Sequence, residues 1–393
     1  MLSPFDPRDE NQIALDDGVH TRTFAELERR LARLGSLLRD ELGVPAGGHV
    51  ALLTPNRVEG VELVLASLLC GVWITPTSHH LAKDEVEYVL EDSGARVVFV
   101  DRSLLALIPA GFAGEVIDLD SLDARLEPLA DRPFDADAPP GGTMIYTSGT
   151  SGRPKGVKRT PPPSLALALA AWREAGRAFG LDGSGPHLVT GPLYHAAPLL
   201  FALYDLLNGA PLIVMRRWDE RAFLELVRTR RVVHTHLVPT TITRLLRLPE
   251  SERPRESLGS LSLVMHGAAP ITPEVKRATL DWLGPIVSEY WGATEGGIYT
   301  LASAAEWLAR PGTVGRAIPA FRIFAVDDAG DALPPGAEGT LVCRHARLER
   351  PFVYHRDEAK TELAYRAPFE FTVGDLGSVD EEGYVFLGER RSN

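Results

Sequence analysis

Hydrophobic and polar positions along the first third of the chain predict helices and strands in alternation. Thr23 and Glu26 fit the capping-box pattern of a helix start, and the apolar positions that follow repeat with helical spacing through Leu42. Further helices are predicted over 58–70 and 84–93, and strands over 49–53, 72–75 and 97–100. This β-α-β-α-β order predicts a mostly parallel, doubly wound sheet.

The same alternation returns in the middle of the chain. It predicts helices over 163–179, 199–207 and 221–228, and strands over 187–190, 212–215, 232–237 and 261–265. After about Pro311 the pattern changes to short strands over 322–326, 339–343 and 384–387, separated by Gly, Pro and Asp turns. We therefore predict an α/β protein with two doubly wound, mostly parallel sheets flanked by helices, plus a small β-barrel-like subdomain. The predicted boundaries are 1–165, 166–310 and 311–388.

Composition and charge narrow the class of protein. A chain of 393 residues with 45% hydrophobic and 24% charged residues can bury a sizeable core. Its net charge of −12 argues against nonspecific binding to nucleic acid or to an anionic membrane. No signal peptide is evident, and the longest apolar stretch, 63–75, is too short to span a bilayer. Cys70 and Cys343 make no metal or disulfide pattern, which favours the cytoplasm.

The segment Tyr146–Gly156 carries the clearest chemical pattern. It combines four Ser/Thr hydroxyls, three glycines and Lys155 within eleven residues. Glycines let backbone N–H groups turn inward, hydroxyls add donors, and the lysine adds positive charge, so the segment predicts a cradle for a polyphosphate. It is not a Walker A loop, because Pro154 and Gly156 flank the lysine, and it lacks the Gly-x-Ser-x-Gly of a hydrolase elbow.

Two carboxylates further along the chain are candidate partners of this loop. Glu295, after Thr294, is suited to hold Mg²⁺ against phosphate oxygens, although a plain helix cap beside a core tryptophan has the same pattern. Asp375 and Arg390 can bind the two hydroxyls of a ribose, although an aspartate in a turn is common. The small-residue turn 266–270 lets backbone approach a planar base closely.

These motifs, in this order, resemble those of the adenylate-forming superfamily, which includes acyl-CoA synthetases, luciferases and adenylation domains. The resemblance implies that Lys155, Thr294, Glu295 and His195 are the catalytic residues, with Glu295 as the Mg²⁺ ligand. It implies a nucleotide site formed by Thr147, Ser148, Gly149, Thr150, Ser151, Gly152, Gly267, Ala268, Ala269, Trp291, Asp375 and Arg390. It implies an acyl site formed by Tyr194, His195, Gly267, Trp291, Gly292 and Ile298.

The segments 234–240 and 306–315 look most like the corresponding segments of acyl-CoA ligases that act on fatty, bile-acid, steroid or terpenoid carboxylates. The implied reaction joins a bulky hydrophobic acid to coenzyme A through an acyl-adenylate, using ATP and Mg²⁺ and releasing AMP. The implied partners are therefore small molecules, with a homodimer as the expected assembly. His234 and His236 lie on one face of a predicted strand, but no third ligand stands nearby, which disfavours a metal pair.

The sequence departs from the family in two places. Trp291 stands where the family usually has tyrosine, and the segment 389–393 ends at the hinge where the family continues into a mobile lid. The larger ring can shape an alicyclic pocket or disfavour productive ATP placement. Two further hypotheses about function therefore stay open beside a ligase that catalyses both steps. One is an enzyme that only converts a preformed acyl-adenylate to the thioester, and the other is a lidless protein that binds an acyl-adenylate or acid.

Overall fold

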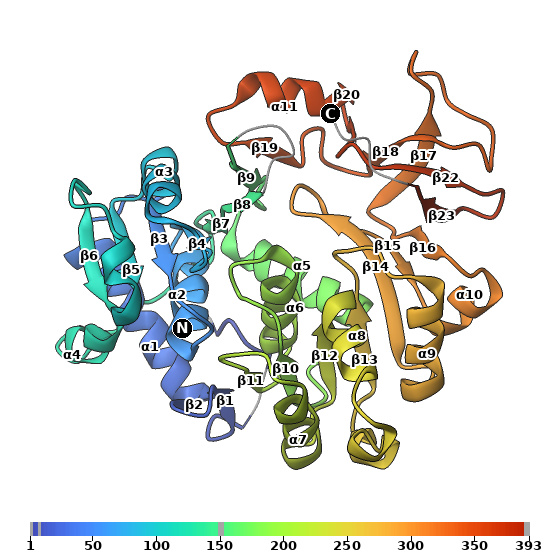
Figure 1. Ribbon diagram of the computed structural model, residues 1–393. Coiled ribbons are helices and arrows are strands. Elements are labelled where there is room, and N and C mark those ends of the chain that lie inside the picture. Colours follow the sequence, from blue (N-terminus) through green and yellow to red (C-terminus); the bar gives the residue numbers. More distant parts are fainter. Residues whose placement is uncertain (1–2, 7–8, 148–152, 389–393) are drawn as a thin grey trace. The chain divides into compact units, whose positions relative to one another are not determined.

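The computed structural model describes residues 3–6, 9–147 and 153–388. The chain forms two units, of which unit 1 comprises Met1–Tyr146 and Pro161–Trp218, and unit 2 comprises Thr147–Thr160 and Asp219–Asn393 (Figure 1). The predicted subdomains 1–165, 166–310 and 311–388 divide the chain at other points, and they stay a prediction.

The first sheet of unit 1 has five parallel strands in the order β6-β5-β3-β4-β7. Its strands are β3 (His49–Leu53), β4 (Trp73–Thr77), β5 (Val97–Val100), β6 (Glu115–Asp118) and β7 (Gly142–Thr143). The helices between and around them are α1 (Phe24–Ser36), α2 (Val58–Leu69), α3 (Lys83–Ser93) and α4 (Leu122–Leu126). A π-helical turn (Leu37–Glu41) continues α1, and two 3₁₀ turns span Arg102–Leu107 and Leu119–Ser121. The parallel pairings confirm the doubly wound order predicted for this region.

A second group of strands in unit 1 has the order β2-β1-β11-β10. The strands are β1 (Ile13–Asp16), β2 (Thr21–Thr23), β10 (His187–Val189) and β11 (Leu212–Val214), accompanied by the helices α5 (Leu165–Ala178) and α6 (Ala196–Leu207). Only the β1–β2 pairing is antiparallel among these described pairs. The short strand β8 (Ile145–Thr147) leads toward the predicted phosphate loop.

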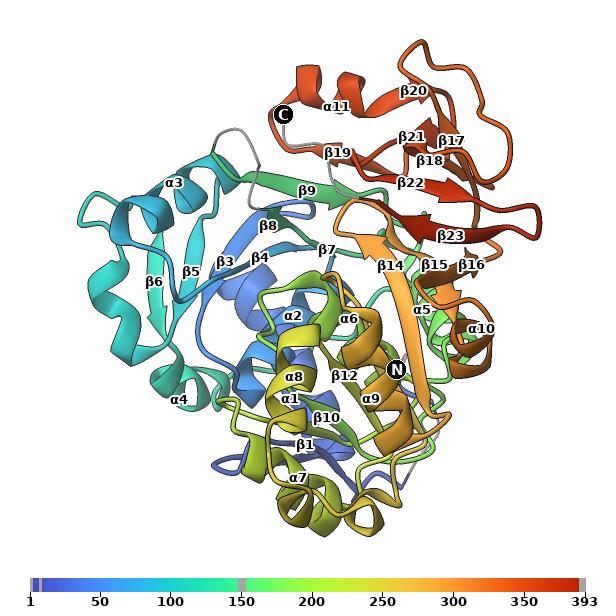
Figure 2. The same ribbon diagram turned by 45° about the vertical axis from the view of Figure 1, so that its right-hand side comes forward.

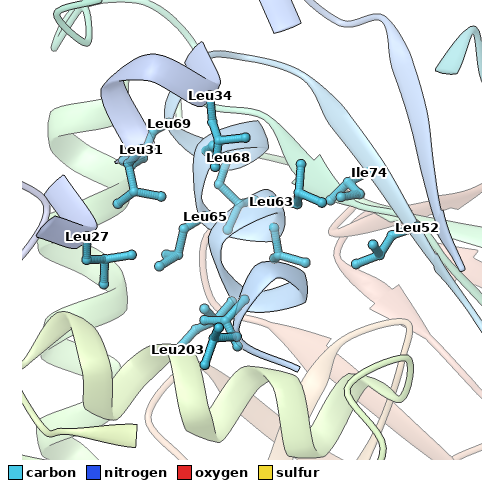
Figure 3. Close-up of a cluster of buried hydrophobic side chains, with 14 of the residues drawn as sticks. Leu27, Leu31, Leu34, Leu52, Leu63, Leu65, Leu68, Leu69, Ile74 and Leu203 are labelled. Carbon is cyan, nitrogen blue, oxygen red and sulfur yellow. The ribbon is translucent and has the colours of Figure 1, made fainter. Parts of the chain in front are cut away.

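Helix α1 shows how local sequence fixes an element of unit 1. The Thr23 hydroxyl accepts from the Glu26 N–H at 3.2 Å, and the Glu26 carboxylate accepts from the Thr23 N–H at 2.8 Å, so the predicted capping box is present. Leu27, Leu31 and Leu34 follow at helical spacing and are fully buried. In Figure 3 they lie among the leucines of α2, where 12 consecutive residues are buried (Figure 3). A helix buried on all sides forms the centre of this core.

Unit 2 begins with a parallel sheet and continues as an antiparallel one. Strands β12 (His234–Leu237), β13 (Leu263–His266) and β14 (Val287–Ala293) are parallel neighbours, and β14 then pairs antiparallel with β15 (Gly297–Ala302), which pairs with β16 (Thr313–Ala317). The helices are α7 (Glu220–Arg230), α8 (Pro239–Leu246), α9 (Pro273–Leu283) and α10 (Ala304–Ala309), with 3₁₀ turns at Glu250–Glu252 and Arg255–Leu258.

The last part of unit 2 is the predicted small antiparallel sheet. Its strands are β17 (Phe321–Val326), β18 (Gly339–His345), β20 (Tyr365–Ala367), β21 (Glu370–Phe371), β22 (Leu376–Val379) and β23 (Tyr384–Leu387). Strand β9 (Lys155–Arg159) pairs antiparallel with β19 (Phe352–Tyr354), which leads into α11 (Glu358–Ala364). The predicted fold class, a mixed α/β protein with large sheets flanked by helices, is confirmed. Within the described ranges, no helix has both the length and the apolar character needed to cross a membrane.

Candidate active site

Trp291 and Asp375 meet in unit 2. The indole N–H of Trp291, on β14, donates to Asp375 Oδ2 at 2.8 Å, and Trp291 is only 5% exposed. Asp375 directly precedes β22, and its backbone oxygen accepts from the Leu341 N–H on β18 at 2.9 Å. The structure thus joins two residues 84 positions apart that were both predicted to contact the nucleotide.

The β14–β15 hairpin presents Thr294 and Glu295. Tyr354, on β19, donates its phenolic O–H to Glu295 Oε1 at 2.8 Å, while Arg159, on β9, donates Nε–H to the Thr294 carbonyl at 3.0 Å. Glu295 is 9% exposed. The Glu295 carboxylate offers hard oxygen donors, the kind that Mg²⁺ takes together with phosphate oxygens, so this residue fits the predicted metal.

Lys155, at the start of β9, lies against Asp357. Its Nζ is 3.3 Å from Asp357 Oδ2. Asp357 also caps α11 by accepting from the Lys360 N–H at 3.0 Å, and this hydrogen bond and the lysine hold the pKa of the aspartate below its ordinary value. Because β9 pairs with β19, Lys155 and Arg159 stand on the strand beside Tyr354, so the lysine and Glu295 are positioned by one pair of strands.

The turn after β13 approaches β14 closely. A Cβ on Gly267 would lie 2.5 Å from the Tyr290 carbonyl oxygen, so only glycine fits. Ala268 has φ +66°, in the left-handed region that a non-glycine residue seldom adopts. Gly292 is equally constrained, since a Cβ there would lie 2.2 Å from the Gly297 carbonyl oxygen. This arrangement brings flat backbone, rather than side chains, to the predicted adenine position.

In unit 1, Tyr194 and His195 end the loop before α6. Their rings lie 4.5 Å apart, and the Tyr194 ring meets that of His79 edge-on at 5.5 Å. Desolvation lowers the pKa of His195, which keeps its imidazole neutral at pH 7. His80 lies against His79 at 4.2 Å, so unit 1 gathers two further imidazoles that the sequence did not single out for this site.

Other predicted residues are placed as follows. Thr147 is half-buried at the end of β8, and Ile298 is buried on β15. His236 Nε2 lies 3.0 Å from the Tyr290 hydroxyl, so this histidine has a structural partner in place of a metal. The predicted residues Ser148, Gly149, Thr150, Ser151, Gly152 and Arg390 lie outside the described residues.

Sequence reasoning missed Arg159, Tyr354 and Asp357, the three residues that hold the predicted site residues of unit 2 in place. None of them belongs to a motif that carries chemistry by itself. The pairing of β9 with β19 brings them to the site, and this pairing joins segments almost 200 residues apart.

One further group of possible metal ligands occurs among the described residues. Within the described part of the chain, only Asp17, His20 and Glu59 bring three possible ligand atoms within 4.8 Å of one another. Asp17 already pairs with Arg216 at 3.0 Å and Glu59 with Arg57 at 2.7 Å, so arginines offset both charges.

Comparison with known proteins shows the family to which the chain belongs. Residues 6–351 match the AMP-binding enzyme family, and the chain belongs to this family. It is 28% identical over 386 residues to a 2-succinylbenzoate–CoA ligase of Geobacillus kaustophilus (strain HTA426), covering 97% of this chain and 75% of the relative. It is 30% identical over 388 residues to a feruloyl-CoA synthase of Amycolatopsis sp, covering 96% and 75%.

Solved structures show the same fold. ATP-bound MatB from Rhodopseudomonas palustris aligns with a TM-score of 0.84 and 26% identity, over 98% of this chain and 77% of that one. O-succinylbenzoate coenzyme A synthetase (MenE) from Bacillus subtilis, in complex with AMP, aligns with a TM-score of 0.80 and 25% identity, over 97% and 76%. The predicted enzyme class, an AMP-forming acid–thiol ligase that works through an acyl-adenylate, is confirmed, as are ATP or AMP and CoA as its nucleotide ligands.

Proposed function

We propose that this protein ligates a bulky hydrophobic carboxylic acid to coenzyme A in two steps. A carboxylate oxygen of the acid attacks the α-phosphorus of ATP, the bond from this phosphorus to the β-phosphate oxygen breaks, and pyrophosphate leaves. The CoA sulfur then attacks the acyl carbon, the bond to the AMP oxygen breaks, and the thiol proton passes to solvent. No covalent bond to the protein is required, so orientation and charge stabilisation supply the catalysis.

The observation that carries this proposal is the shared support of Lys155 and Glu295. Asp357, the cap of α11, lies 3.3 Å from the lysine ammonium on β9, and Tyr354, on the paired strand β19, donates to the glutamate at 2.8 Å. An ammonium and a carboxylate that are both held by residues at this pair of strands suit a polyphosphate with its Mg²⁺. In this proposal Glu295 binds Mg²⁺ and Thr294 binds an α-phosphate oxygen. Asp375 binds the ribose hydroxyls.

The acyl group is the finer part of the proposal. Ile298 and Trp291, both in unit 2, are buried side chains with large apolar surfaces. Relatives named for ferulate and for long-chain fatty acids support a hydrophobic acyl group here. Neutral His195 borders the acid in this scheme and adds no second charge beside the carboxylate.

The cellular setting follows from the same observations. Cys70 and Cys343 are free, and burial raises the pKa of the Cys70 thiol to about 12. Buried, protonated thiols without a disulfide suit a reducing compartment, so we propose a cytoplasmic enzyme.

We also propose that the protein forms a homodimer, and light scattering of the purified chain tests this assembly. The three subdomains given above remain part of the proposal.

The deciding experiment is ATP–pyrophosphate exchange with the purified chain and a panel of acids. Aromatic, alicyclic and long-chain acids are compared with acetate and malonate at equal concentration, and we expect exchange only with the bulky set. A parallel assay supplies CoA and a synthetic acyl-adenylate. Thioester formation without exchange would contradict the two-step proposal and favour an enzyme of the second step alone. Tight adenylate binding with neither reaction would favour a binding protein.

A further inference from the structure

A buried ionic cluster lies between α9 and the two strands that this helix connects. Helix α9 lies beside β14 (Figure 2). His266, at the end of β13, and Glu289, on β14, are register partners in the parallel sheet, and Lys276 reaches both from α9. Lys276 Nζ is 3.3 Å from Glu289 Oε2, and His266 Nε2 is 3.5 Å from the same oxygen. Lys276 also hydrogen-bonds His266 Nε2. His266 and Lys276 are fully buried, and Glu289 is 6% exposed.

The proton positions in this cluster follow from the contacts. An ammonium has only donors, so His266 Nε2 accepts from Lys276 and the imidazole is neutral, with its proton on Nδ1. Burial and the charge of Lys276 lower the pKa of His266 well below its ordinary value. Burial likewise lowers the pKa of Lys276 to about 8, against the opposing charge of Glu289, and raises the pKa of Glu289.

Packing a helix on a sheet through such a cluster costs free energy. Charges removed from water lose hydration that their mutual attraction only partly replaces, and well-packed apolar residues serve as well or better. The same helix packs apolar Leu280 and Leu283 into the core. The position of the cluster gives a reason for its presence beyond packing.

Both strand ends that carry predicted adenine contacts leave directly from this cluster. His266 is followed by Gly267 and by Ala268, whose left-handed backbone is strained and needs support from its surroundings. Glu289 lies two residues before Trp291, on the same face of β14, and Trp291 in turn binds Asp375. One ammonium therefore fixes the relative position of the turn and the indole.

We propose that Lys276 is a positioning residue of the nucleotide site, which holds the Gly267–Ala269 turn and the Trp291 indole in place through His266 and Glu289. This inference rests on the proposed function, because it takes the turn and the indole to face a nucleotide. Loss of the ammonium, by substitution or by deprotonation, leaves Glu289 without its cation and His266 without its donor. The strand ends then lose their common support, and nucleotide affinity falls.

The groups that face Lys276 define what else titrates nearby. His266 and Glu289 face it from the two strands. His236, on β12, lies further away and lowers the pKa of His266 through its charge. The Trp307 ring of α10 lies 6.0 Å from Nζ, and the Arg277 guanidinium lies over the same ring. The Trp291 indole N–H is not one of these groups, so its NMR resonance can report on the nucleotide site.

The test uses the full chain labelled with ¹⁵N-tryptophan. The indole N–H resonance of Trp291, assigned by its loss in Trp291→Phe, is followed from pH 6.5 to 9.5, and AMP affinity is measured by calorimetry at pH 7. Lys276→Met removes the charge, Lys276→Arg keeps it, and Thr279→Val removes another buried polar group of α9, one that hydrogen-bonds only within the helix. The Arg variant also serves if the Met variant does not fold.

We expect the wild-type Trp291 resonance to titrate near pH 8, and Lys276→Met to abolish this titration and weaken AMP binding about tenfold. Lys276→Arg should restore most of the affinity without a titration below pH 9.5, and Thr279→Val should behave as wild type. An unchanged affinity and a Trp291 resonance indifferent to Lys276 would overturn the inference. Failure of the wild type to bind AMP would instead overturn the proposed function, and the Trp291 titration would still decide whether Lys276 controls the indole.

Discussion

The Trp291 indole N–H donates to the Asp375 carboxylate at 2.8 Å. This contact gives the larger ring at position 291 a defined role. An indole N–H is a donor without an acceptor, so it can orient a carboxylate that accepts from it. The carboxylate predicted to receive the ribose is therefore oriented before the nucleotide arrives, which reduces the ordering that binding requires.

Trp291→Phe tests this orientation. The substitution keeps an apolar aromatic face but removes the donor, and the loss of one hydrogen bond to a carboxylate should weaken AMP binding by about 1 kcal/mol, or roughly fivefold in Kd. Calorimetry with AMP measures the change. The matched control is Trp282→Phe, which removes an equally buried indole donor bonded to the Arg253 carbonyl at 3.1 Å. Equal losses in both variants would mean that the effect is general destabilisation.

Tyr354→Phe should weaken metal-dependent binding selectively. Removal of the phenolic donor leaves Glu295 free to rotate, and the loss of such an outer partner of a metal ligand typically costs about tenfold in affinity. We expect the Kd of ATP to rise about tenfold with Mg²⁺ present and to stay nearly constant with EDTA.

Tyr365→Phe is the control for this experiment, because its hydroxyl donates to the Phe352 carbonyl at 2.7 Å on the same part of the sheet but does not contact Glu295. A parallel rise with and without Mg²⁺ in Tyr354→Phe would show that Tyr354 supports the fold and not the metal ligand.

Asp357→Asn should weaken ATP binding, because Lys155 loses the carboxylate that holds its ammonium in place. Asparagine is as good a helix cap as aspartate, and both members of the ion pair are partly exposed, so the free energy of unfolding should change by less than about 1 kcal/mol. ATP affinity should fall about two- to threefold, since the lysine then has to be ordered when the nucleotide binds. Glu362→Gln, which removes an ion pair between helix α11 and Arg350, should leave affinity unchanged. A rise in affinity in Asp357→Asn would show that the aspartate competes with phosphate for the lysine and does not position it.

The sequence allowed most of the parallel α/β layers to be predicted, because their strands and helices have strong apolar periodicity. The strand Val287–Ala293 was not predicted, although it carries Trp291. It holds Glu289 and Gly292 among its apolar residues, so it lacks the hydrophobic run of the other central strands. The burial of Glu289 depends on Lys276 from α9, and local periodicity contains no information about such a partner.

The residues of the candidate site differ in how far the sequence points to them, for a similar reason. Asp375, Glu295 and Lys155 stand in short local motifs, whereas Tyr354 and Asp357 act only because β19 pairs with β9. Long-range pairing depends on register and on the surrounding sheet, which short sequence patterns do not encode. Candidate residues with a local motif could thus be proposed from the sequence, and the residues that contact them in the structure could not.

His266 should make the stability of the protein depend on pH. Burial keeps the folded imidazole neutral, with its pKa well below 6.5, while the unfolded chain takes up a proton near pH 6.5. The unfolded state therefore binds more protons below pH 6.5, and the free energy of unfolding should fall by roughly 1 kcal/mol per pH unit as the pH drops below that value. His266→Gln should reduce this slope by that amount. Urea unfolding at pH 5.0, 6.0 and 7.5 measures the slopes, and equal slopes in wild type and His266→Gln would show that position 266 is protonated in the folded protein.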